Sequence, residues 1–540
     1  MLLFFRIYRL VIFLACALLP QKQPGTGNGY IEVTVRGDKD LEPMPCRAWI
    51  ESGETRYFTP ETPATPYDRD FSFSCRGFFR IRVPAGEAAI HIERGLEFIP
   101  IIRKVVVKSG QTVEKEVLLE RWVSMHEEGW YSSDMHVHFG SDDINILKEL
   151  SLADDVNLVP AFTYWYHRLE DMEKKWPPWR HGGVVRADSL HVITLNNIEI
   201  ERIGGEPFHS IGAPFFFNLD EPLYVAKGSY TYPSNTMLQR SAKELSPRCV
   251  IDTDKPLWAE NVAGVALGLF DVVQICHNHY HREDNLRMGW GMIGAISGDE
   301  KELAGSREEL FRRTLRIYYR WLNCGFRLGV SGGSAIGVMP VPLGCNRTYA
   351  RVEGALTPAK YWRAVSKGRT FATSGPMITL TADDRCPGET VRLRSGDHAR
   401  LEIRVRIRSI EKLDSVQIIQ NGDVVHSQDL SSLDPSPVLD REFTAAVSPG
   451  RSGWLAARAC YKTGKGFQRI AHTSPVYISV DGEDVASKED AEYMIKWIDE
   501  LLKLSQTPGR YPSDSQRDEV RAIFRKAREK YELIINKGDR

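Results

Sequence analysis

The sequence carries almost no net charge, and this excludes several classes of partner. At pH 7 the formal charge of the 540 residues is −1, so no overall field attracts nucleic acid or an anionic membrane. Two motifs are also absent: the Cys-x-x-Cys pair of zinc ribbons and redox sites, and the Walker-type phosphate loop. The chemistry of this protein must therefore be inferred from local sites.

Long apolar runs are confined to the N-terminus. Residues 1–24 carry Arg6 and Arg9 before an apolar run, a pattern typical of a secretory signal peptide or an N-terminal anchor. The best later candidate for a membrane span, residues 257–276, is interrupted by charged side chains. We expect a secreted or periplasmic protein, lipid-anchored or N-terminally anchored as alternatives, with no membrane span beyond the N-terminal segment.

Cysteines are few. Of nine, Cys16 lies in residues 1–24, which leaves eight. An even number in an exported protein permits disulfides. Cys46 and Cys75 both fall in one small N-terminal domain and are the candidate pair, provided that their Cα atoms lie close together.

Hydrophobic periodicity divides the rest of the chain into four segments. Residues 28–122 and 381–482 show short alternating runs separated by turn residues, which predicts a β-sandwich in each. Residues 128–380 alternate strand-like and helical stretches, which predicts an α/β layer or barrel. Residues 486–540 begin with a capping-box pattern and hold two amphipathic stretches, which predict a helical hairpin.

The stretch Gly129–His138 is the densest candidate site. His136 and His138 are separated by one residue, so a strand places both imidazoles on one face, where one divalent ion can take both. A lone His-x-His is more simply read as two polar residues of a wet strand face. Ten of the fourteen histidines, however, fall between His126 and His281, and this clustering favours a metal site.

Other metal-ligating side chains follow in the same segment. Glu199 and Glu201 alternate along one strand face, and His277 and His279 come directly after an apolar run. Together with the first pair they supply enough nitrogen and oxygen ligands for one or two hydrolytic metals.

Gly129–His138 resembles the opening motif of the polymerase and histidinol phosphatase (PHP) superfamily, specifically its CehA/McbA-like metallohydrolase branch. In that branch Gly-Trp-Tyr-x-x-Asp-x-His-x-His follows a β-sandwich, and the resemblance covers roughly Gly129 to Gly375. It implies a multidomain α/β and β fold: a distorted (β/α)7 barrel flanked by two β-sandwich domains and the C-terminal helical hairpin. It also implies a hydrolase of ester, amide or phosphoester bonds that uses a metal-activated water.

The resemblance implies roles for individual residues. The metal, zinc, manganese or iron, would be held by His136, His138, Glu199 and His279, with His277 as the alternative to His279. Catalytic or supporting roles would fall to Glu201, His209 and Asp134.

Two segments depart from the family pattern. Thr163–His167 stands where family members carry Thr-Asp-His, and Gly332–Gly337 stands where Ser-Asp-x-His is expected. His167 is a candidate replacement for a missing ligand.

These departures leave two functions open. The protein is either an exported hydrolase acting on a small molecule or glycan, or a degenerate barrel that binds a metal or a carbohydrate without turnover. No nucleic-acid partner is expected, and the sequence does not determine the oligomeric state.

Overall fold

The computed structural model describes residues 27–138, 144–166, 183–202, 211–221, 223, 231–281, 307–395, 400–462 and 468–538. The expected N-terminal signal segment, His167 and His209 lie outside these residues. Within the described ranges, no helix is both long and apolar enough to cross a membrane.

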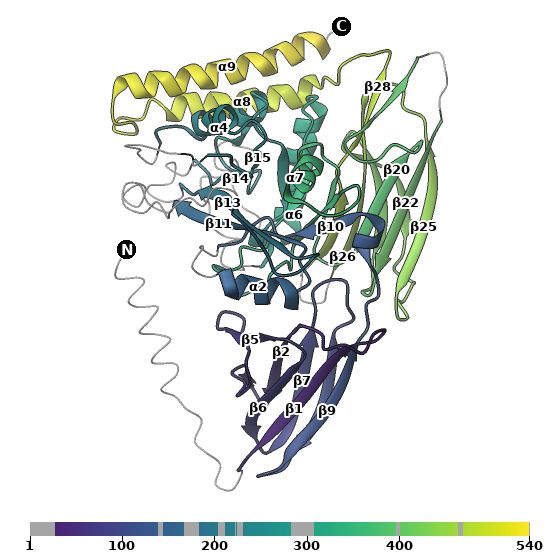
Figure 1. Ribbon diagram of the computed structural model, residues 1–540. Coiled ribbons are helices and arrows are strands. Elements are labelled where there is room, and N and C mark those ends of the chain that lie inside the picture. The colour runs from purple at the N-terminus through teal and green to yellow at the C-terminus, as the bar shows by residue number, and fades with distance from the viewer. Residues whose placement is uncertain are drawn as a thin grey trace.

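The N-terminal residues form two sheets that face each other (Figure 1). Their strands are β1 (Asn28–Gly37), β2 (Cys46–Ser52), β3 (Thr55–Tyr57), β4 (Thr65–Tyr67), β5 (Ser72–Cys75), β6 (Phe78–Pro84), β7 (Gly86–Glu93), β8 (Ile101–Val107) and β9 (Thr112–Leu119). One sheet has the order β6-β1-β9 and the other β4-β5-β2-β7-β8, with β3 beside β2. Alternate residues of β1, such as Ile31 and Val33, enter the core between the sheets because strand side chains alternate in direction.

Cys46 and Cys75 are direct cross-strand partners on β2 and β5. Their Sγ atoms lie 3.6 Å apart, as two thiols rather than a disulfide. The two cysteines therefore lie close together, as the candidate pairing requires.

The central part of the chain builds a mixed sheet. Its strands are β10 (Trp130–Ser133), β11 (Leu158–Tyr166), β12 (Val184–Arg186), β13 (Val192–Ile200), β14 (Phe215–Phe217), β15 (Val250–Asp252), β16 (Val272–Cys276), β17 (Gly329–Gly332), β18 (Arg347–Arg351) and β19 (Thr370–Thr373). The helices around it are α2 (Ile144–Ala153), α4 (Asn235–Leu245), α5 (Asn261–Ala266), α6 (Arg307–Asn323) and α7 (Pro358–Ser366). The strand order is β17-β16-β15-β14-β13-β11-β10-β18-β19, with β12 beside β13.

The predicted (β/α)7 barrel is wrong. β14 runs antiparallel to β13 and to β15, and β18 runs antiparallel to β10 and to β19. Among the described residues no strand ladder joins β17 back to β10; the sheet continues instead from β19 into the C-terminal region, to 16 strands in all. Antiparallel neighbours need no crossover helix. Alternating apolar runs therefore do not distinguish hairpins from repeated β/α units.

The C-terminal strands share this large sheet. They are β20 (Met377–Ala382), β21 (Thr390–Leu393), β22 (Leu401–Ser409), β23 (Ser415–Gln420), β24 (Asp423–Asp429), β25 (Leu439–Val447), β26 (Gly453–Lys462), β27 (Gln468–Thr473) and β28 (Val476–Val480). β27 pairs with β19, whereas β20, β22 and β25 form a separate sheet that closes the apolar core over it. The large sheet therefore includes strands from both sides of the predicted boundary near residue 380.

Two helices end the described chain, α8 (Lys488–Leu504) and α9 (Asp514–Gly538). The Ser487 side chain accepts a hydrogen bond from the backbone N–H of Asp490 and caps α8, as the capping-box pattern predicts. Both helices lie over α4 and α5 (Figure 1). Trp497 Nε1 donates to the Ala259 carbonyl at 2.9 Å, and the Tyr531 hydroxyl donates to the Val262 carbonyl at 3.1 Å.

Candidate metal centre

The segment after β10 holds two histidines side by side. Val137, between them, is fully buried and bridges Ala161 on one side and Ile336 on the other. This extended backbone places His136 and His138 on the same face. The predicted strand-end pair is therefore formed.

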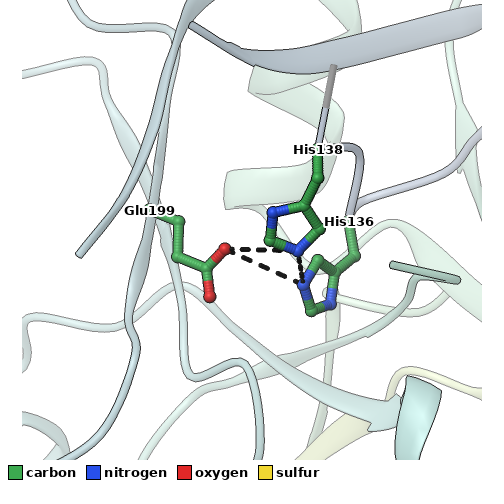
Figure 2. Close-up of side chains that lie close together, drawn as sticks. All are labelled: His136, His138 and Glu199. Carbon is green, nitrogen blue, oxygen red and sulfur yellow. Dashed lines mark hydrogen bonds and ion pairs between the residues drawn. The ribbon is translucent and has the colours of Figure 1, made fainter. Parts of the chain in front are cut away.

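Three predicted ligands meet at this point (Figure 2). The Nε2 atoms of His136 and His138 are 2.8 Å apart. Glu199, on β13, faces them, with Oε2 at 3.4 Å from His138 Nε2 and 3.9 Å from His136 Nε2. His136 and Glu199 are each only 2% exposed. These side chains form a group that could hold one metal ion.

The protonation of the group suits a cation. Burial, the neighbouring His138 and the charge of Lys255 lower the pKa of His136 well below its usual value, so its imidazole is neutral at pH 7. Burial and the charges of Glu201 and Asp254 raise the pKa of Glu199 well above its usual value. An added positive charge would lower the pKa of Glu199, and a neutral imidazole at His136 has a nitrogen lone pair available to a metal.

The geometry also fits an ion. Within the described residues Glu199 Oε2 is buried and accepts no hydrogen bond, a costly state for a carboxylate. Tetrahedral coordination at 2.0–2.1 Å sets two ligand nitrogens roughly 3.3 Å apart, so the imidazoles need to separate by only about half an ångström. The residues present therefore fit a divalent metal.

Asp134 organises the backbone around the histidines. Its carboxylate accepts hydrogen bonds from the backbone N–H groups of His136 at 3.0 Å, Ser334 at 2.9 Å and Gly344 at 2.8 Å, and from the Ser334 hydroxyl. Burial raises its pKa to about 6 despite these bonds. Asp134 thus ties the end of β10 to the loop after β17, which is a supporting role for the histidine backbone.

The glycine-rich segment Gly332–Gly337 backs the two histidines. A Cβ on Gly333 would lie 2.5 Å from the Cβ of His136, and one on Gly337, at φ +91°, would lie 2.7 Å from the His138 carbonyl oxygen. The Tyr67 hydroxyl of the N-terminal sandwich accepts the Gly337 N–H at 2.9 Å. Close backbone approach therefore explains the glycines at positions 333 and 337.

A buried ion pair adjoins the group of three, and sequence reasoning did not single out its lysine. Asp254 Oδ1 lies 3.7 Å from His136 Nδ1. Lys255 Nζ donates to both Asp254 oxygens, at 2.6 and 2.7 Å, and Trp258 Nε1 donates to Oδ2 at 2.8 Å. Burial raises the pKa of Asp254 to about 6 against these contacts.

Aromatic rings wall the group and were also missed. The ring of Phe215, on β14, lies 4.5 Å from that of His136, and the ring of Phe162, on β11, lies 5.5 Å from that of His138. They come from strands distant in the sequence, and only the pairing of those strands places them beside the histidines.

The remaining predicted residues lie around the group or away from it. Glu201 is half-buried, and its charge acts on Glu199. His279 acts electrostatically on His136, and its ring lies 6.4 Å from Trp258. His277 Nε2 lies 3.2 Å from the Thr314 hydroxyl of α6. In the described part of the chain neither His277 nor His279 joins the group of three.

Comparison with known proteins does not identify a relative of this chain. No family model, no curated protein and no solved structure matches the chain. Its function is therefore argued from the site.

Proposed function

We propose that the protein is an exported metal-dependent hydrolase whose ion is held by His136, His138 and Glu199. The observation that carries the proposal is that the buried Glu199 Oε2, which accepts no hydrogen bond from the described residues, faces two adjacent imidazoles. Three protein ligands leave a coordination position open, as in catalytic rather than structural metal sites. The resemblance of Gly129–His138 to the opening motif of the PHP superfamily supports the same chemistry.

The ion and the residues around it would have different roles in the reaction. A bound divalent ion supplies Lewis acidity, lowering the pKa of a coordinated water to about 7 and polarising a carbonyl or phosphoryl oxygen. Glu201, half-buried at the end of β13, is the candidate proton acceptor. Phe162 and Phe215 keep bulk water from the ligands. His279, whose charge acts on His136, is a candidate to contact the substrate or a coordinated water beside the three ligands.

The proposal names a class of metal and a class of substrate. Zinc, manganese and iron all accept imidazole and carboxylate ligands. The substrate would be an ester, amide or phosphoester of a small molecule or glycan.

A second function, binding without turnover, is favoured by one observation. Ser334 stands in the segment where the family pattern expects further ligands, and its hydroxyl bonds to Asp134 and to the Ile336 N–H. The ion would then serve to hold a ligand such as a carbohydrate.

Elemental analysis of protein purified without chelator tests the site. We expect about one equivalent of a transition metal in the wild type and none in His136→Ala/His138→Ala. Ser334→Ala, which alters the same loop without removing a ligand, should keep its metal. Unchanged metal content in the double variant would contradict the site. Hydrolysis of ester, amide or phosphoester substrates by the loaded protein would then separate the enzyme from the binding protein.

A further inference from the structure

A basic hollow opens beside α7, apart from the metal centre. Its volume is about 380 Å³, and one carboxylate, Glu353, lines it. Its five basic lining residues are Arg351, Lys360, Arg363, Lys367 and Arg369. Arg351 pairs with Trp130 at the amino end of β10, whereas the histidines follow the carboxyl end of that strand. The hollow is therefore a separate site.

Most of this positive charge is not neutralised. Arg369 lies 3.3 Å from Glu353 and 3.4 Å from Glu389. Lys360 donates instead to a backbone carbonyl, that of Glu353 at 3.0 Å, and Arg351 donates to the Cys386 sulfur at 2.8 Å. Within the described ranges no carboxylate forms an ion pair with the other four basic side chains of the hollow. In a chain of net charge −1 this is a marked local excess.

A second hollow of about 430 Å³ shares Lys367 and Arg369 with the first and adds Arg327. Arg327 lies over the Tyr477 ring, 3.9 Å from its centroid, and donates to the Thr390 hydroxyl at 2.8 Å. The acidic residues that line this second hollow are already paired: Asp271 with Lys243 at 2.7 Å, and Glu389 with Arg369. The two hollows together form one extended basic surface.

We propose that this surface binds an acidic polysaccharide through its sulfate or carboxylate groups. Guanidinium groups bind such oxyanions through paired hydrogen bonds, and two adjoining hollows suit a chain that carries several charges. Nucleic acid fits less well, because bases need open aromatic faces to stack on. Tyr477 is the one aromatic residue among the described lining residues, and Arg327 already covers its ring.

Binding of defined oligosaccharides to the whole protein tests the proposal. The probes are a heparin oligosaccharide, a polygalacturonate oligosaccharide of similar length and a single-stranded DNA, titrated calorimetrically at several salt concentrations. The first two separate sulfate from carboxylate recognition. We expect at least one of them to bind with an affinity that falls as salt rises, because binding releases counterions.

The variant Arg363→Glu/Lys367→Glu reverses two exposed charges of the hollow. It should weaken oligosaccharide binding by about tenfold or more and flatten the salt dependence. Arg525→Glu/Lys526→Glu makes the same charge change on an exposed face of α9 and should bind like the wild type. Circular dichroism and metal content check that both variants fold. Equal losses in the two variants, no oligosaccharide binding by the wild type, or tighter binding of DNA would overturn the proposal.

Discussion

Two buried clusters of charged side chains differ in how fully their members are paired. In the first, Asp155 accepts hydrogen bonds from Arg94 at 3.1 Å and Arg121 at 2.8 Å, and lies 3.2 Å from His191 Nε2. In the second, the candidate metal centre, Glu199 Oε2 accepts no hydrogen bond within the described residues. Burial is shared by both clusters. What marks a ligand site is the missing partner rather than the burial.

Two histidines show the same contrast. Burial disfavours the charged form of His191, but hydrogen bonds to Asp155 and Asp188 outweigh it and raise the pKa above its usual value. For His136, burial, His138 and Lys255 all lower the pKa. The Asp155 network thus favours the charged form of His191, whereas the surroundings of His136 favour its neutral form.

The Asp155 network joins segments far apart in the sequence. Arg94 and Arg121 follow strands of the N-terminal sandwich, and Asp155 follows α2. Arg347 on β18, fully buried, donates to the Asp155 carbonyl at 2.9 Å. This cluster therefore fixes the sandwich to the central sheet.

The largest expected effect comes from breaking the paired cluster. Asp155→Asn suits the left-handed backbone at φ +51°, which asparagine tolerates, but it removes the charge that faces two arginines. We expect a loss of about 3 to 5 kcal/mol in the free energy of unfolding, because it leaves buried cations uncompensated. Urea denaturation measures it. A stability close to the wild type would show that solvent or Glu97 compensates the arginines. The contrast between the paired Asp155 cluster and the candidate metal centre would then be wrong.

The matched change in the metal centre, Glu199→Gln, should act with the opposite sign on stability. Removing a buried carboxylate charge whose Oε2 accepts no hydrogen bond from the described residues should leave the metal-free protein as stable as the wild type or more so. Losing a partner that only contacts a metal ligand costs up to about 100-fold in metal affinity. Losing a ligand itself should therefore lower the affinity by at least about 100-fold. Denaturation without metal and competition with a chelator measure the two effects. A metal-free variant as unstable as Asp155→Asn would contradict the assignment.

The smallest expected effect is a pH dependence. Because the pKa of His191 is raised in the folded state, its contribution to stability is fully present below about pH 6.5 and is lost as pH rises through the folded pKa. His191→Gln should therefore destabilise the protein more at about pH 6 than at about pH 9. Urea midpoints across this range measure the difference. A cost that grows with pH would mean that His191 is buried neutral, like His136.

Local patterns predicted much of the secondary structure but not its assembly. Alternation located strands such as β1 and β22, and the capping pattern at Ser487 located the start of α8. The direction in which β14 and β18 pair depends on contacts between distant segments, and the barrel prediction failed there.

The same division runs through the candidate site. The sequence by itself determined that His136 and His138 share a face, since strand alternation is a local property of the backbone. The family resemblance already implied that Glu199 joins the two histidines, and the structure brings the three together. Only the tertiary structure decided that Lys255 lies beside the group and that His277 turns to α6. The reason is physical: these residues come from different strands and loops, and their distances depend on how the sheet is paired and packed.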